Sequence, residues 1–255
     1  MATNVIGLSV YCDSTVLGEV CNNPDVHTIH IIRNWDDLNT AYDYYVWTEL
    51  LENIATVVSF GKKFALTIVT GNKSPDWIYA SPYSVQSLSF DEFETNLPIG
   101  SVTTHVVPLF TDSTYKTLWK KFLEDLSTML QTNYVVTEGD IWNSLSRITI
   151  TGINTSSGMC SMNNQTNITD GVLASSNAIE IWQTAGVDSN VVADTFVDIY
   201  YYFEEYFQGI TKVVYFENEG FPELDNLFID FLIVDTIYDD NLPIIPIYDN
   251  TSMYD

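Results

Sequence analysis

One nearly continuous apolar run constrains the fold of this chain more than any other feature of its sequence. Residues Lys63 to Val69 are almost all apolar, which is typical of a parallel strand covered on both faces. Before this run, apolar residues recur at helical spacing from Tyr42 to Phe60, and Gly61 is a natural helix stop. A β-branched run, Val26 to Arg33, precedes that helix. A strand, a helix and a strand in this order predict the right-handed crossover unit of an α/β fold.

Further segments extend the same alternation. Strands are predicted at Val5–Tyr11, Arg147–Thr151, Lys212–Glu217, Phe228–Val234 and, weakened by two prolines, Leu242–Ile247. Helices are predicted at Tyr115–Leu130, capped by Asp112 or Ser113, and at Val191–Phe207. Residues 71–111 lack strong periodicity and are long for a plain connection, which favours a functional excursion above the sheet. The 255 residues match the roughly 250 of one α/β barrel, so one domain is predicted over residues 1–255, irregular over 226–255.

The charge balance excludes two classes of partner. Nine Lys and Arg face 34 Asp and Glu, which gives a formal net charge of −25. Nucleic acids and anionic membranes are bound by clusters of Lys and Arg, so neither is an expected partner. Residues Met1 to Val10 hold no basic region before an apolar stretch, and no apolar run reaches the roughly 18 to 20 residues of a membrane span. We therefore expect a cytoplasmic protein or a component of an assembled particle.

Acidic residues are concentrated near the C-terminus. Between Asp188 and Asp255, fifteen acidic residues accompany one basic residue, Lys212. A solvated acidic face accounts for this distribution, while a basic partner and a Ca²⁺ site at Asp235, Asp239 and Asp240 stay open as alternatives. Those three aspartates match no EF-hand spacing, and the chain has no recognisable cofactor motif. We predict no cofactor and no metal.

Several short strings together resemble a known family. In chain order they are Ile32-Arg33-Asn34-Trp35-Asp36-Asp37-Leu38, Gly61-Lys62-Lys63, Thr70-Gly71-Asn72-Lys73-Ser74-Pro75-Asp76-Trp77-Ile78-Tyr79, Ile148-Thr149-Ile150-Thr151-Gly152 and Gly220-Phe221-Pro222-Glu223-Leu224. The set resembles the (β/α)₈-barrel glycoside hydrolases of the broad β-galactosidase and cellulase superfamily. The resemblance covers roughly residues 5–225, about five of eight strands, and implies a TIM-type barrel that is incomplete or irregular at its C-terminal end.

The resemblance also implies where a sugar binds. Working loops of such barrels follow the C-terminal ends of the strands, which gives these candidate substrate-binding residues: Arg33, Asn34, Trp35, Asp76, Trp77 and Asn154. Aromatic rings offer flat apolar faces to sugars, while amide, carboxylate and guanidinium groups bond to hydroxyls. For Trp35 and Trp77, packing of a loop against the barrel rim is the competing interpretation.

Glycoside hydrolysis needs two carboxyl groups, one as proton donor and one as nucleophile or base. In the resembled family the proton donor is a Glu after the fourth strand, but from Ile141 to Thr169 this chain has no Asp or Glu. Asn and Ser cannot replace it, because they hold no proton of useful pKa. Glu217 and Glu219 follow the fifth strand and, two residues apart, share a face if that strand continues. They are the candidate catalytic pair, with a charged rim as the alternative.

Three functions follow from this pattern. The favoured one is a glycoside-hydrolase-like barrel that has lost catalysis and serves as a carbohydrate-binding or structural component of a surface or particle. The alternatives are an active glycosidase with carboxylates in atypical positions, and an assembly protein unrelated to sugars. A carbohydrate ligand and a protein assembly partner are therefore the candidate partners.

His27 and His30 lie three residues apart on one strand and so on opposite faces, which disfavours a shared metal.

Overall fold

The computed structural model describes the backbone of residues 8–11, 16–93, 102–135, 139–153, 168–169, 172–173, 176–216 and 245–248. Its main sheet has six parallel strands in the spatial order β1 (Leu8–Tyr11), β2 (Val26–Asn34), β5 (Lys63–Val69), β10 (Leu145–Thr149), β13 (Thr211–Phe216) and β14 (Ile245–Tyr248). The spatial order follows the chain order, so each crossover adds a strand in the same direction, as in an α/β barrel. The predicted α/β class is confirmed.

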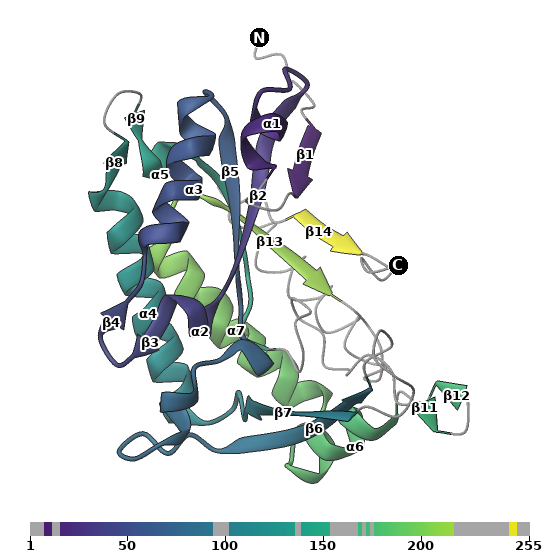
Figure 1. Cartoon of the computed structure of the whole chain (residues 1–255). Coiled ribbons are helices and arrows are strands. Elements are labelled where there is room, and N and C mark those ends of the chain that lie inside the picture. The colour runs from purple at the N-terminus through teal and green to yellow at the C-terminus, as the bar shows by residue number, and fades with distance from the viewer. Residues whose placement is uncertain are drawn as a thin grey trace.

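The long helices cover one face of this sheet. They are α3 (Thr48–Ser59), α4 (Ser113–Thr132) and α7 (Ser189–Tyr206), and Figure 1 shows all three on the same side, with α4 and α7 packed together. As predicted, Asp112 caps α4: its carboxylate accepts from the backbone N–H groups of Thr114 and Tyr115, at 2.7 and 3.1 Å. The predicted helix at Val191–Phe207 is confirmed by α7.

The other described elements are short. They are α1 (Leu17–Cys21), α2 (Trp35–Leu38), β3 (Asn39–Ala41), β4 (Tyr44–Tyr45), the 3₁₀ turns η1 (Gly71–Lys73) and η2 (Asp76–Tyr79), β6 (Ser87–Phe93), β7 (Val102–Pro108), β8 (Tyr134–Val135), β9 (Gly139–Asp140), α5 (Ile141–Ser144), β11 (Ile168–Thr169), β12 (Val172–Leu173) and α6 (Ser176–Thr184). The connections that follow β2 and β5, which hold β3, β4, β6 and β7, lie at the lower end of the sheet in Figure 1. This is the end where the strands terminate.

The helix predicted from Tyr42 begins later, at Thr48. The preceding residues form the antiparallel hairpin β3–β4 instead. Asp43 stands in its turn with a φ of 55°, a conformation that a helix excludes but a tight hairpin turn requires. The side chain of Asn39 bonds to the carbonyls of Ala41 and Tyr44, at 2.7 and 3.2 Å, and holds the hairpin closed.

The excursion predicted at residues 71–111 contains more regular structure than expected. After η1 and η2, the strands β6 and β7 pair antiparallel from Ser87 opposite Pro108 to Phe93 opposite Val102.

Helix α6 was not predicted from the sequence. Strand β14 lies at the end of the sheet order, where Pro246 is tolerated because an edge strand has one side without ladder bonds. The strand predicted at Phe228–Val234 lies outside the described residues.

Candidate functional site

The two faces of β2 point to different surroundings. Ile29 and Ile31 are buried, and Arg33, on the same face, pairs with Glu49 of α3 at 2.6 Å. Side chains alternate along a strand, so His30 lies on the opposite face, away from the helices. There His30 Nε2 lies 2.7 Å from Thr67 Oγ1 of β5, and the Thr67 hydroxyl donates to Thr149 Oγ1 of β10 at 2.6 Å. This inner face therefore carries a chain of three polar groups across three strands.

The surroundings of His30 determine its charge. Burial, assisted by the nearby Arg147, lowers the pKa of His30 to about 4. The imidazole is therefore neutral at pH 7 and is a poor proton acceptor there.

The segment that follows β10 turns into the core. Ile150, Thr151 and Ile153 are at most 4% exposed. Gly152 has a φ of 127°, and a Cβ there would lie 2.9 Å from Trp119 Nε1. The Tyr115 hydroxyl of α4 donates to the Gly152 carbonyl at 2.9 Å. The described residues just after β10 are therefore small or apolar groups that pack under the helices.

No strand of the main sheet contains Asp or Glu within its described bounds. Carboxyl groups occur instead just after the strands: Asp36 and Asp37 after β2, and Asp76 after β5. Asp36 is half-buried, and burial together with the neighbouring Asp37 raises the pKa of its carboxyl, while Lys73 opposes this. Across the part of the chain that the structure describes, no group of three His, Cys, Asp or Glu side chains is arranged to hold a metal ion.

The connection after β2 is organised by Asn39. This side chain is 3% exposed, and its Oδ1 accepts from Trp35 Nε1 at 3.3 Å. Its backbone carbonyl accepts from Trp77 Nε1 at 2.8 Å, which joins the hairpin to η2. Trp35 is completely buried and packs edge-on against Trp119, with ring centroids 5.0 Å apart. Asn39 thus links the core tryptophan, through its side chain, to the rim tryptophan, through its backbone carbonyl.

An aromatic cluster of Tyr42, Trp77 and Tyr83 lies on this rim. Tyr42 stacks on Tyr83 with centroids 5.1 Å apart and an interplanar angle of 29°. Trp77 meets both rings edge-on, at 6.0 Å from Tyr42 and 5.2 Å from Tyr83. Tyr42 is 45% exposed, and the other two rings are partly exposed. The cluster is therefore a partly exposed aromatic surface made of three rings in contact.

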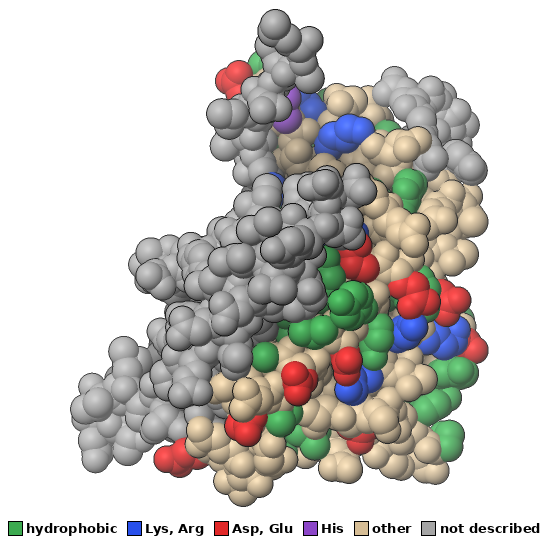
Figure 2. All heavy atoms as spheres, turned by 180° about the vertical axis from the view of Figure 1, so that it is seen from behind, with side chains coloured by type: hydrophobic (Ala, Val, Ile, Leu, Met, Phe, Trp, Pro, Cys, Tyr) green, Lys and Arg blue, Asp and Glu red, His purple; other side chains and the backbone are tan. Residues whose placement is uncertain are grey.

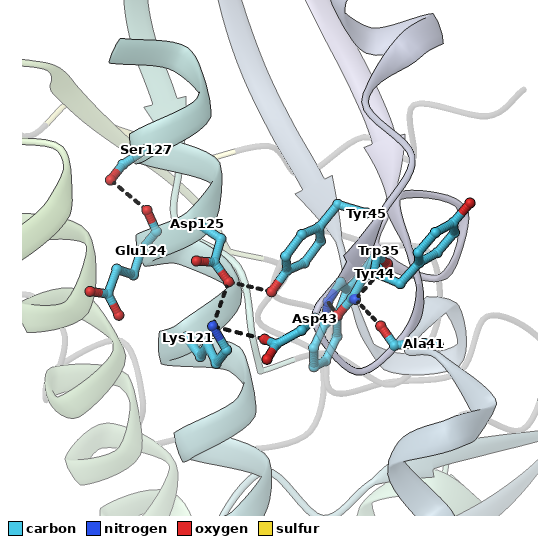
Figure 3. Close-up of polar contacts among 10 residues, drawn as sticks. Trp35, Ala41, Asp43, Tyr44, Tyr45, Lys121, Glu124, Asp125 and Ser127 are labelled. Carbon is cyan, nitrogen blue, oxygen red and sulfur yellow. Dashed lines mark hydrogen bonds and ion pairs between the residues drawn. The ribbon is translucent and has the colours of Figure 1, made fainter. Parts of the chain in front are cut away.

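A charged network fastens the hairpin to α4 (Figure 3). The Tyr45 hydroxyl donates to Asp125, and Lys121 pairs with both Asp43 and Asp125 at 2.9 Å. Burial and the Asp125 carboxylate raise the pKa of Tyr45, so the phenol stays protonated and keeps donating. The hairpin is therefore joined to the rest of the fold by the Asn39 side chain and by contacts with α4.

The predicted binding residues have different surroundings. Asp76 is exposed and Trp77 partly exposed on the rim, while the Asn34 amide donates to Asp37 at 3.0 Å. Arg33 is engaged with Glu49 on the helix side of the sheet. Trp35 is completely buried and offers no exposed ring face for stacking, so the competing interpretation, core packing, applies to it. Asn154, Glu217 and Glu219 lie outside the described residues, as do Asp235, Asp239 and Asp240.

Sequence reasoning missed Asn39, Tyr42 and Tyr83. An available signal was the run Asn39-Thr40-Ala41-Tyr42-Asp43-Tyr44-Tyr45, where Asn and Asp flank tyrosines as in a hairpin. Because Tyr42 was assigned to a helix, its exposed position in a hairpin turn was not predicted. Tyr83 had no local signal, because its role comes from packing against a residue about forty positions away.

Neither a protein-family model nor a curated protein sequence matches this chain. Among solved structures, it is similar to the β-galactosidase of the Antarctic haloarchaeon Halorubrum lacusprofundi, with 11% identity over 98% of this chain and 41% of that one, at a TM-score of 0.53. The β-galactosidase of Bacillus circulans sp. alkalophilus gives 10% identity over 98% and 40%, at 0.51. The chain thus spans about two fifths of the length of these enzymes. At such low identity the likeness shows the fold alone, and at that level it confirms the predicted glycoside-hydrolase resemblance.

None of the helices in the described residues has the length and apolar character needed to cross a membrane.

Proposed function

We propose that this chain is a glycoside-hydrolase-like barrel that binds a carbohydrate without cleaving it. The aromatic cluster of Tyr42, Trp77 and Tyr83 is the observation that supports this most directly. Partly exposed flat rings pack against the C–H faces of sugars, and here three of them meet at the edge where the strands end. Asp76, exposed beside Trp77, supplies a carboxylate acceptor for sugar hydroxyls.

Loss of catalysis is supported by the distribution of carboxyl groups. Cleavage requires two of them about 5 to 10 Å apart across the bond. The described strands of the main sheet contain none, and the stretch from Ile141 to Thr169, where the resemblance places the proton donor, has no Asp or Glu. The enzyme alternative would use Asp36, whose raised pKa suits a proton donor, with Glu217 or Glu219 as its partner.

Binding to an array of neutral oligosaccharides, followed by calorimetric titration of the best ligand, tests the proposal. We expect Tyr42→Ala to weaken binding about tenfold, since a lost stacking contact costs roughly 1 kcal/mol or more. The matched control is Tyr44→Ala on the same hairpin, because Tyr44 is 62% exposed and lies outside the cluster. Equal losses in both variants, or no binding by the wild type, would contradict the proposal.

A structural role in a particle is the outcome favoured if no sugar binds. A defined assembly in solution scattering, formed equally well by the Tyr42→Ala protein, would then support an assembly protein unrelated to sugars. A binding isotherm with intact ligand would favour the carbohydrate-binding role instead.

A further inference from the structure

A groove lies at the other end of the strands, near the residues where β10 and β13 begin. It is lined by Gln131 of α4, Trp142 of α5, and Glu205, Tyr206 and Gln208 at the end of α7. Its volume of about 470 Å³ is within the range of roughly 300 to 1,000 Å³ common for small-molecule sites. Three separate segments contribute, so the groove exists only in the folded chain.

The aromatic wall of this groove is rigid. Trp142 stacks on Phe207 with ring centroids 5.8 Å apart and an interplanar angle of 17°. Phe207 is completely buried, so the indole rests on the core while its partly exposed remainder lines the groove. A ring fixed in this way loses little conformational entropy when a ligand packs against it.

The charge in the groove is already compensated. Glu205 Oε2 lies 2.7 Å from Lys120 Nζ, and this partner lowers the pKa of the Glu205 carboxyl. The same ammonium lies 5.3 Å from the ring centre of Tyr202 and 5.7 Å from that of Tyr206. The protein thus supplies its own cation, which removes the electrostatic gain that a cationic or anionic ligand would need.

Ion pairs join α4 and α7 at more than one point along their contact. Lys116 also joins Asp198 at 2.7 Å, and Figure 2 shows Lys and Arg side chains beside Asp and Glu in the lower half of the described surface. The groove differs from its surroundings by combining aromatic rings with two glutamine amides, each able to donate and accept hydrogen bonds.

From this combination we infer that the groove is a second binding site, and that its ligand is a neutral saccharide. The rings of Trp142 and Tyr206 would pack against the C–H face of a sugar. Gln131 and Gln208 would bond to its hydroxyls, and the carboxylate of Glu205 would accept from them. The inference does not depend on the rim cluster of Tyr42, Trp77 and Tyr83, because the two lie at opposite ends of the strands.

Saturation-transfer NMR with cellotriose, xylotriose and maltotriose tests this site. The measurement is made in the Tyr42→Ala background, so that binding at the rim is already weakened. Adding Gln131→Ala and Gln208→Ala should weaken the remaining binding at least tenfold, as should Trp142→Ala. Gln183→Ala, which removes an exposed glutamine of α6, is the control and should change nothing.

The outcomes separate this inference from the proposed function. If the double substitution of Gln131 and Gln208 removes all binding and Tyr42→Ala removes none, the groove inference is supported and the rim proposal fails. The groove inference is overturned if Tyr42→Ala alone removes all binding. It is also overturned if the double glutamine substitution has no effect in the Tyr42→Ala protein. Trp142→Phe keeps a ring on Phe207 and should retain most of the affinity, which separates lost stacking from a damaged fold.

Discussion

Two connections that leave the same edge of the sheet have opposite character. After β2, the hairpin β3–β4 carries Tyr42 outward and is held by buried and charged contacts. After β10, residues Ile150–Ile153 turn inward and pack beneath α4 and α7. The first connection thus exposes an aromatic ring at the edge of the sheet, whereas the described part of the second adds side chains to the core. Two connections at one edge can therefore differ completely in what they present to solvent.

The largest expected effect separates Trp35, in the connection after β2, from Trp77, in the connection after β5. Trp35→Ala should lower the free energy of unfolding by about 3 to 5 kcal/mol, since it empties a completely buried site. Trp77→Ala should cost about 1 to 2 kcal/mol, because its ring is partly exposed, yet it should weaken sugar binding more. Urea unfolding of both variants measures the difference. Equal costs would show that the rim is not divided into core and surface.

Gly152→Ala tests the inward turn after β10. The positive φ and the close approach of Trp119 should together cost about 3 kcal/mol of unfolding free energy. Gly61→Ala is the matched control: Gly61 has a φ of 68°, but a Cβ added there would meet nothing within 4 Å, so the change should cost about 1 to 2 kcal/mol. Thermal and urea unfolding would contradict the packing account if the two costs were the same.

A pH titration of stability tests the inner face. The pKa of His30 is about 4 in the folded protein and about 6.5 in the unfolded chain, so the folded state binds this proton less readily. Stability is therefore unaffected by this group above pH 6.5 and falls as the pH drops toward 4, by about 3 kcal/mol. His30→Gln should flatten this part of the profile, while His27→Gln, which alters an exposed residue, should leave it unchanged. Identical profiles for the three proteins would contradict the assignment.

The smallest expected effect concerns how the hairpin is fastened. Tyr45→Phe removes the bond to Asp125 and should cost about 1 kcal/mol, since Lys121 still pairs with that carboxylate. Tyr44→Phe should change stability by less than about 0.5 kcal/mol, because its ring is largely exposed. Urea unfolding checks both. A larger loss in Tyr44→Phe would mean that the hairpin is held by contacts other than those in Figure 3.

The sequence predicted the parts of the fold that depend on local patterns. The buried run at β5, the capped helix α4 and the amphipathic helix α7 each follow from spacing and capping within one segment. The site was less predictable, because Asn39, Tyr42 and Tyr83 gain their roles from contacts across two connections. Trp35 and Trp77 have similar sequence surroundings, and only tertiary packing places one in the core and the other on the rim.

The most direct test is to incubate the protein with the oligosaccharide it binds best and to analyse bound and recovered sugar by mass spectrometry. The account predicts saturable binding, reduced in Tyr42→Ala, with the sugar recovered intact after prolonged incubation. Shortened products whose formation is abolished by Asp36→Asn, Glu217→Gln or Glu219→Gln would contradict it, because they would establish a working pair of carboxyl groups in this barrel.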